Sequence, residues 1–255
     1  ADYLLRFAER LPEDGGFKRL IRRGAWYPQA EHAVFQAMTC PGHSSVLTGA
    51  WPARTGLALN KWWDRETGEK VYCVADARHR LVGAPTRAGA GSSPRRMRTG
   101  TLGDVLIESG FQSHVVTVSL KDRAAIALGG HRAQHALWFE PEAHRWVSSD
   151  YYWRTGTAPG WVNALNERLA ARKAEANVWR ASGPGGGLSQ TGAFEHSAPR
   201  ADKAALASPF GDALTLDAVE AALNAVPLGQ DTHPDLLAVS FSAFDKAGHA
   251  YGAES

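Results

Sequence analysis

Two short stretches of this 255-residue chain are nearly continuously apolar, which is the pattern of strands buried inside a parallel sheet. They are Val115 to Val118 and Leu236 to Phe241, and each leads directly into polar residues and then a helical pattern. Longer stretches repeat apolar residues at the spacing of one helix face, and they cover 39–49, 101–108, 161–176 and 214–226. Strands that alternate with helices predict an α/β fold, with a mostly parallel sheet and helices on both faces.

The N-terminal part of the chain has a different pattern. Residues 3–10 and 17–21 carry apolar side chains on one side, which predicts two helices, the second ending at Gly24. Residues 25–37 are expected to be mostly extended. An α/β domain that opens on a helix lacks the strand that feeds it, so we expect the first strand to lie upstream of Ala1.

Two regions interrupt the alternation of strands and helices. Residues 65–100 contain a Thr-Gly turn that predicts a short hairpin, followed by a loop rich in Gly, Ser and Arg. Residues 133–200 contain a second predicted hairpin and a glycine-rich stretch. We interpret both regions as insertions or cap segments of a single α/β domain that covers 1–255 and is incomplete at both ends.

The amino-acid composition excludes few classes of protein. The formal net charge of +2 does not require a nucleic acid or an anionic membrane as partner, and no apolar run is long enough to cross a bilayer. Cys40 and Cys73 are too few for a disulfide framework, and we expect two buried thiols. The nine Trp residues gather in clusters, which we interpret as anchors of the core and of loops.

The candidate chemistry lies at three places that share one feature. Thr39, the pair Lys121 and Arg123, and the pair Asp245 and His249 each follow the C-terminal end of an extended segment. Open α/β sheets bind their ligands along this edge. We therefore expect these residues, distant in sequence, to lie close together.

Thr39 opens a predicted helix in which Pro41 occupies a first-turn position that tolerates a missing N–H, and Gly49 ends the helix. A hydroxyl at a helix N-terminus faces free backbone N–H groups and the positive end of the dipole, which favours a phosphate or an oxyanion. The same position is also compatible with a simple N-cap.

The other two places have comparable alternatives. Asp245 and His249 offer a carboxylate and an imidazole four residues apart, suitable for zinc, although an N-cap Asp and an unrelated His give the same pattern. Lys121 and Arg123 are suitable for holding phosphate oxygens, or are two surface cations. Asn60 can donate its amide to the same phosphate, or is a turn residue.

Four ordered motifs together resemble the bacterial alkaline phosphatases that use a threonine nucleophile. These enzymes belong to the alkaline phosphatase superfamily, beside the type I phosphodiesterases and nucleotide pyrophosphatases. The motifs are TCPGHSSVLTG at 39–49, NKWWD at 60–64, SLKDRAAI at 119–126 and SFSAFDKAGH at 240–249. The resemblance extends over essentially the whole chain.

The resemblance implies a zinc-dependent phosphomonoester hydrolase with a phosphothreonine intermediate. Thr39 would be the nucleophile and a ligand of one of two zinc ions, and Asp245 and His249 would bind the other. Small phosphate monoesters would be the substrates, and the protein would be periplasmic or secreted. The phosphoryl oxygens would be held by Asn60, Lys121 and Arg123.

The sequence also lacks several metal ligands that the resemblance leads us to expect. The family needs an Asp at the end of the first strand, an Asp-His pair and a further His, and none of these can be matched here. Three ligands do not complete two zinc sites, so we interpret the chain as a fragment and expect it to be inactive and poorly folded alone.

Two other functions fit the sequence. A phosphodiesterase or nucleotide pyrophosphatase of the same superfamily is one, although the Lys-x-Arg pair favours a monoester dianion and diesterases typically lack it. A non-catalytic, carbohydrate-directed binding protein is the other, based on the Trp clusters.

Overall fold

The computed structural model describes residues 4–5, 7–32, 34–85, 91–172, 176–180, 195–199 and 203–252. The chain divides into two compact units, Ala1–Phe35 and Gln36–Ser255. The first unit contains the short 3-10 helix η1 (Ala8–Arg10) and the helix α2 (Gly16–Arg23), which ends at Gly24 as predicted. The longer helix expected over 3–10 is reduced to η1 and helical residues 4–5, and residues 3 and 6 lie outside the described part.

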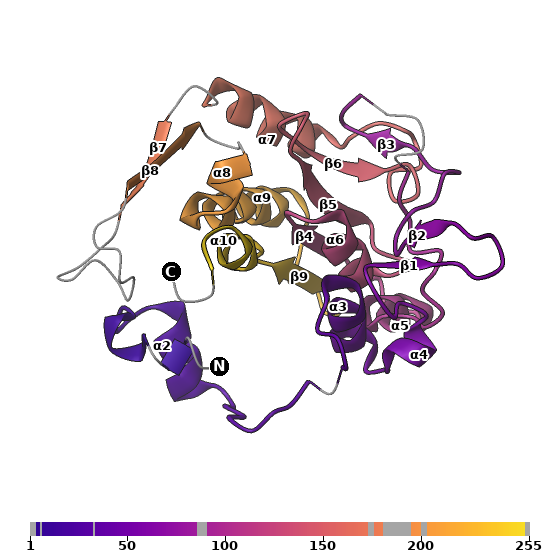
Figure 1. Cartoon of the computed structure of the whole chain (residues 1–255), viewed down its shortest axis with the longest axis horizontal. Helices are drawn as coiled ribbons and strands as arrows, with labels where there is room; N and C mark the ends of the chain where they lie inside the picture. Colours follow the sequence, from indigo (N-terminus) through magenta and orange to yellow (C-terminus); the bar gives the residue numbers. More distant parts are fainter. Residues whose placement is uncertain are drawn as a thin grey trace. The chain divides into compact units, whose positions relative to one another are not determined.

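A five-stranded mixed sheet forms the centre of the second unit (Figure 1). In spatial order its strands are β3 (Leu81–Val82), β6 (Arg145–Ser149), β5 (His135–Glu140), β4 (Val115–Ser119) and β9 (Leu236–Ser240). β4 runs parallel to β5 and to β9, whereas β6 runs antiparallel to β5 and to β3. The predicted α/β fold with helices on both faces is confirmed; the sheet itself is mixed, and its parallel part is β5, β4 and β9.

β4 is the strand that fits its sequence pattern most closely, because all five of its residues are buried. Its one central polar side chain, Thr117, donates its hydroxyl to the carbonyl of Ala125 at 2.8 Å, so no polar group is left unpaired there. β9 has an equally apolar sequence but is half-buried throughout, since it forms an edge of this sheet. The edge position, and not the composition, accounts for its exposure.

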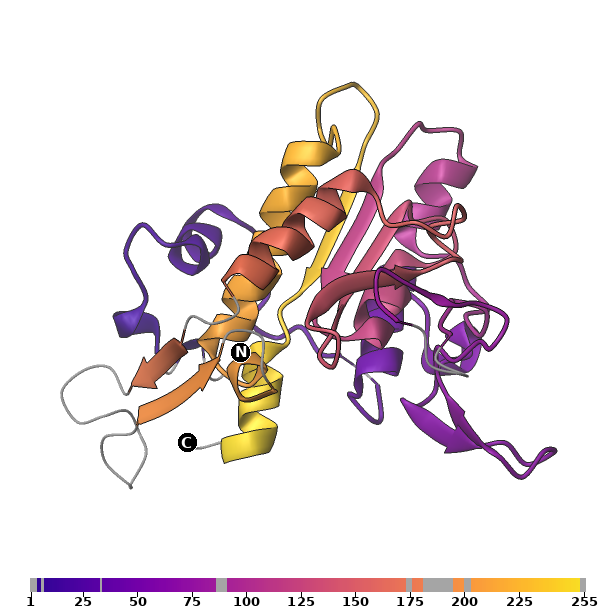
Figure 2. The same ribbon diagram turned by 90° about the horizontal axis from the view of Figure 1, so that it is seen from above.

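Helices cover both faces of the sheet (Figures 1 and 2). α5 (Leu102–Glu108) and α6 (Asp122–Gly129) lie on one face, and α7 (Gly160–Ala171) and α9 (Pro209–Ala225) lie on the other. α3 (Thr39–Thr48) packs on α6, and α10 (Ala243–Tyr251) packs on α9. The α5 contact is so close that a Cβ added at Gly103 would lie 2.8 Å from Cγ1 of Val115.

The remaining elements lie within or next to the regions that the sequence assigned to insertions, 65–100 and 133–200. The hairpin predicted at the Thr-Gly turn is present as β1 (Lys61–Trp63) and β2 (Lys70–Tyr72), and β7 (Ala176–Arg180) pairs antiparallel with β8 (Glu195–Pro199). β5 and β6 also fall within 133–200, but they are strands of the central sheet and not of an insertion. The glycine-rich stretch within 181–194 lies outside the described residues. The two short helices are α4 (Pro52–Thr55) and α8 (Lys203–Leu206).

The core of the second unit includes several of the tryptophans. Trp138, Trp146 and Trp153 are each at most 4% exposed, which confirms their interpretation as core anchors. Trp63, by contrast, is exposed on β1. None of the helices in the described part of the chain is long and apolar enough to cross a membrane.

Candidate functional site

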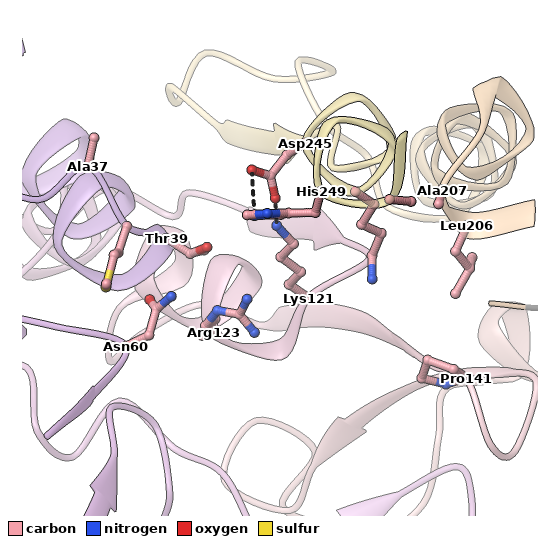
Figure 3. Close-up of a pocket in the computed structure, with 13 residues that line it drawn as sticks. Ala37, Thr39, Asn60, Lys121, Arg123, Pro141, Leu206, Ala207, Asp245 and His249 are labelled. Atoms are coloured by element: carbon pink, nitrogen blue, oxygen red, sulfur yellow. Dashed lines mark hydrogen bonds and ion pairs between the residues drawn. The ribbon is translucent and has the colours of Figure 1, made fainter. Parts of the chain in front are cut away.

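One cavity of about 770 Å³ collects the residues that the sequence singled out (Figure 3). They come from the start of α3, the residue before β1, the β4–α6 turn and α10. The parallel pairing of β4 with β9 accounts for the convergence, because Ser119 lies opposite Ser240 and both strands end at the same edge. The residues that line the cavity include Thr39, Asn60, Lys121, Arg123, Asp245 and His249.

Thr39 is the first residue of α3, as its sequence pattern predicts. Met38 is the N-cap residue and accepts from the N–H of Gly42 at 2.9 Å, and Gly49 ends the helix at φ 63°. Figure 3 shows the Thr39 hydroxyl pointing into the cavity. The hydroxyl therefore lies at a helix N-terminus, where free N–H groups favour negative charge.

Asn60 is connected to the same helical turn. Its side-chain Oδ1 accepts a hydrogen bond from the backbone N–H of Cys40 at 2.8 Å. With Oδ1 occupied by the backbone, the Nδ2 amide remains as the group that can donate into the cavity. Asn60 is thus more than a turn residue, since it fixes the residue next to Thr39.

The two cysteines correct the sequence analysis. Cys40 and Cys73 are fully buried as expected, but they form a disulfide with Cα atoms 6.6 Å apart, so neither is a free thiol. The pairing depends on the β1–β2 hairpin, which folds back and carries Cys73, the residue after β2, against the first turn of α3. A separation of 33 residues gave no sign of this contact.

Lys121 occupies the turn between β4 and α6, and Arg123 is the second residue of α6. The backbone N–H of Lys121 donates to the Ser119 hydroxyl at 3.2 Å, at the end of β4. The Arg123 guanidinium donates to the phenol oxygen of Tyr72 at 3.4 Å, and that phenol donates to the Asp122 carboxylate at 2.6 Å. Burial and the Asp122 charge raise the pKa of Tyr72, so the phenol stays protonated.

Arg123 also carries a polar atom that the protein leaves unpaired. Its Nε is buried and has no hydrogen-bond partner among the described residues. A buried guanidinium N–H without a partner is costly. An anionic ligand is supported instead by the two cations, Lys121 and Arg123, in the cavity lining.

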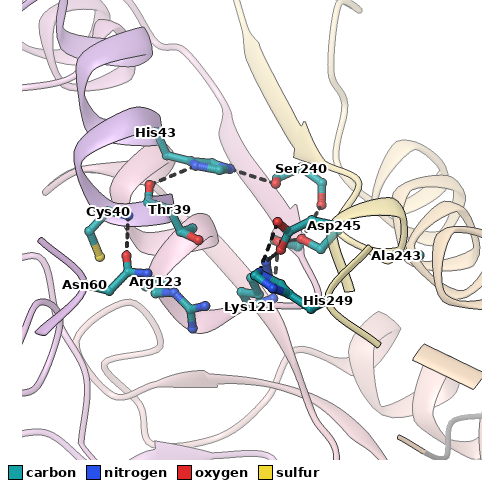
Figure 4. Close-up of polar contacts among 12 residues, drawn as sticks. Thr39, Cys40, His43, Asn60, Lys121, Arg123, Ser240, Ala243, Asp245 and His249 are labelled. Carbon is teal, nitrogen blue, oxygen red and sulfur yellow. Dashed lines mark hydrogen bonds and ion pairs between the residues drawn. The ribbon is translucent and has the colours of Figure 1, made fainter. Parts of the chain in front are cut away.

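Asp245 and His249 lie four residues apart on α10, and the His249 Nε2 atom is 3.6 Å from Asp245 Oδ1 (Figure 4). The ammonium of Lys121 forms an ion pair with the other oxygen, Oδ2. Burial disfavours the charged form of Asp245, but the Lys121 hydrogen bond and the charges of Lys121, His249 and Arg123 outweigh it and lower the pKa of Asp245. The carboxylate is therefore ionised and available to a cation.

The start of α10 is fixed by contacts with α9 and β4. Asp212 in the first turn of α9 accepts from the N–H of Ala243 at 3.0 Å, and burial raises the pKa of Asp212. The hydroxyls of Ser119 and Ser242 lie 3.2 Å apart and connect the end of β4 to the residue before α10. These contacts set Asp245 beside Lys121.

His43 is a site residue that the sequence analysis treated as structural or surface. Its Nδ1 lies 2.9 Å from the carbonyl oxygen of Thr39, and its Nε2 lies 2.8 Å from the hydroxyl of Ser240 (Figure 4). Burial, with the nearby cations Lys121 and Arg123, lowers the pKa of His43, and the neutral ring suits one donor and one acceptor. The signal in the sequence is its position four residues after Thr39 on a helix, which directs it to the first turn.

The donor types in the cavity are those that zinc uses, but they make only part of a site. Asp245 and His249 supply a carboxylate and an imidazole, and Thr39 supplies a hydroxyl. Within the described ranges, no group of three or more His, Cys, Asp or Glu is placed to hold a metal ion. The residues present thus fit two ligands of one zinc ion and a hydroxyl ligand of another.

Lys246 is a further cavity residue that the sequence analysis did not single out. It follows Asp245 on α10, lines the cavity and is half-buried. Burial and the charges of Lys121 and Arg123 lower the pKa of Lys246. Among the described residues, the cavity lining therefore carries three Lys or Arg side chains and one carboxylate.

The fold is that of the alkaline phosphatase superfamily. The chain belongs to the type I phosphodiesterase / nucleotide pyrophosphatase family, whose model matches residues 1–255.

Curated relatives and a solved structure agree with this assignment. The chain is 33% identical to alkaline phosphatase PafA of Elizabethkingia meningoseptica and 34% identical to alkaline phosphatase PhoV of Synechococcus elongatus, and it is covered completely in both comparisons. A crystal structure of PafA superimposes on the whole chain with a TM-score of 0.88. The chain spans about half the length of these relatives, 50% of PafA and 49% of PhoV.

Proposed function

We propose that the protein is a zinc-dependent phosphomonoester hydrolase in which Thr39 is the nucleophile. The observation that carries this proposal is the single cavity lined by the Thr39 hydroxyl, the Lys121 and Arg123 cations, and Asp245 with His249. The names of the relatives, which are alkaline phosphatases, support the same activity. Asp245 and His249 would hold one zinc ion and Thr39 would be a ligand of a second, with the remaining ligands from residues beyond the described ones.

The reaction would proceed in two displacements at phosphorus. The Thr39 oxygen forms a bond to phosphorus while the bond to the alcohol oxygen breaks, and water then displaces Thr39 from the phosphothreonine to give inorganic phosphate. The chemistry that zinc supplies when bound is to lower the pKa of the Thr39 hydroxyl and to neutralise the leaving oxygen. Asn60, Lys121 and Arg123 hold the other phosphoryl oxygens.

The Lys121 and Arg123 pair favours monoesters over diesters. A monoester dianion carries more terminal charge than a diester, so two cations beside the phosphoryl group stabilise it more. The test uses the gene product that carries this chain, with 4-nitrophenyl phosphate and bis(4-nitrophenyl) phosphate as substrates. We expect the monoester to be the better substrate, and the double variant Lys121→Ala/Arg123→Ala to narrow the difference. Equal losses on both substrates would contradict this role.

The phosphodiesterase or nucleotide pyrophosphatase activity stays as a second candidate, because the family model carries that description. It predicts that the diester is the better substrate in the same assay. The variant Thr39→Ala distinguishes the two enzymatic functions from the function of a non-catalytic binding protein. We expect this variant to lose hydrolysis and phosphothreonine formation, and elemental analysis of the parent protein to find two zinc ions per chain.

We also propose a periplasmic or secreted location. The buried Cys40–Cys73 disulfide supports it, because stable disulfides form in oxidising compartments. Fractionation of cells of the source organism, with immunodetection of the protein, tests this proposal.

A further inference from the structure

The cavity extends beyond the residues that would hold a phosphoryl group. Its volume of about 770 Å³ lies within the range of sites for whole small molecules, roughly 300–1,000 Å³. Figure 3 shows Pro141, Leu206 and Ala207 on the side of the cavity away from Thr39 and Asn60. This second part of the lining is mainly apolar, and Lys246 is the charged residue of the lining that the proposed phosphoryl chemistry does not use.

Lys246 differs from the other two cations of the cavity. Lys121 forms an ion pair with Asp245, and Arg123 donates to Tyr72. Within the described part of the chain, the Lys246 ammonium forms no hydrogen bond and no ion pair, although the side chain is half-buried. A partly buried charge without a partner is costly, so the position favours an anion supplied from outside the protein.

The chemistry of phosphoryl transfer places the leaving group on this side. Attacking and leaving oxygens lie roughly in line through phosphorus, so the alcohol departs on the side opposite the Thr39 oxygen. Thr39 lies on one side of the cavity, and Asp245 and His249 lie across from it (Figures 3 and 4). Lys246 follows Asp245 on α10 and lines the same cavity, so it is available to a group carried by the leaving alcohol.

We propose that Lys246 binds a second anionic group carried by the leaving alcohol. The preferred substrates are then phosphate monoesters whose alcohol bears a carboxylate or a further phosphate, with its carbon skeleton against Pro141 and Leu206. This inference rests on the proposed phosphatase function and specifies its substrate class. A neutral alcohol would fill the same space but leave the Lys246 charge unpaired.

The test compares three aryl phosphates that differ at one ring position: phenyl phosphate, 4-carboxyphenyl phosphate and 4-(phosphonomethyl)phenyl phosphate. For each anionic substrate, the measured quantity is the ratio of its kcat/KM to that of phenyl phosphate. Differences in leaving-group reactivity are the same for every form of the protein, so they cancel when the ratio of a variant is divided by the ratio of the parent protein. Comparison of the carboxylate substrate with the phosphonate substrate shows which anion the site prefers.

We expect Lys246→Met to lower this ratio about fivefold to tenfold for at least one of the anionic substrates, the effect of one partly screened charge pair. Lys246→Arg keeps the charge and should keep the ratio within about twofold of the parent protein. Lys70→Met is the matched control, since Lys70 is exposed on β2 and does not line the cavity, and it should leave the ratio unchanged. Thermal unfolding of each variant verifies that the fold is retained.

The possible failures are distinct. If the parent protein hydrolyses all three substrates and Lys246→Met leaves both ratios unchanged, the inference is wrong and the phosphatase proposal stands. If the parent protein hydrolyses none of them, the proposed function is wrong and this inference falls with it.

Discussion

Tyr72 provides the sharpest test of how the site is held together. It lies at the end of β2, where its phenol donates to Asp122 at 2.6 Å and accepts from Arg123 at 3.4 Å. Tyr72→Phe removes one oxygen atom and leaves the ring in place. The phenol touches none of the reacting atoms, so its effect must pass through the position of the Arg123 guanidinium.

The size of the effect follows from these contacts. A hydrogen bond to a charged group contributes about 1.5–3 kcal/mol, and the lower end applies here because Asp122 is 24% exposed and water can replace the phenol. We therefore expect Tyr72→Phe to lower the free energy of unfolding by about 1.5 kcal/mol. If the guanidinium loses a similar share of its interaction with the transition state, kcat/KM for 4-nitrophenyl phosphate falls about tenfold.

The assay must distinguish a displaced Arg123 guanidinium from a partly unfolded protein. Because Arg123 is proposed to hold the extra charge of a monoester, we expect Tyr72→Phe to lower kcat/KM more for the monoester than for the diester. In an Arg123→Ala background the same substitution should have little further effect on kcat/KM. Tyr27→Phe, at a 75% exposed tyrosine, is the control and should change neither stability nor activity. Additive losses in the double variant would refute the positioning role.

Three further predictions use the same measurements. Cys40→Ser/Cys73→Ser should lower the free energy of unfolding by about 3–4 kcal/mol, as expected for a loop of 33 residues, and unchanged urea denaturation would contradict a stabilising disulfide. His43→Ala should lower kcat about tenfold with little change in KM, because two hydrogen bonds of about 1 kcal/mol each hold the Thr39 turn. His43→Asn, which retains a donor near Nδ1, should recover part of kcat, and equal losses in both variants would argue for a packing role. Gly103→Ala should destabilise by about 1–3 kcal/mol in thermal unfolding, since its Cβ would lie 2.8 Å from Val115, whereas Gly160→Ala has no atom within 4 Å and should be nearly neutral.

The sequence was informative where one local pattern determines one structure. Val115 to Val118 is apolar except for Thr117, and a strand covered on both faces satisfies this pattern, as β4 shows. The convergence of Lys121 and Asp245 also followed from local information, because parallel strands present their C-terminal ends at one edge. Secondary structure and edge placement together were sufficient to bring these residues into one cavity.

The contacts that depend on three-dimensional pairing could not be predicted in this way. The Cys40–Cys73 disulfide requires the β1–β2 hairpin to fold back on α3, and nothing in either local sequence specifies that. The hairpin of β5 and β6 was recognised, but its place in the central sheet depends on β5 pairing with β4. Lys246 was not recognised either, since a lysine beside a motif residue is indistinguishable from a surface lysine until the cavity is known.

The β1–β2 hairpin is largely exposed, but its contacts hold several residues of the site in place. Its first flank supplies Asn60, which binds the Cys40 N–H, and its last residues supply Tyr72 and Cys73, which contact Arg123 and Cys40. Three separate contacts at the base of one hairpin thus connect the helix that carries the proposed nucleophile to a cation in the first turn of α6. Because those two elements belong to different parts of the chain, this connection fixes their separation, on which the proposed phosphoryl transfer would depend. The hairpin is therefore a support of the site, and its base is where substitutions should affect catalysis.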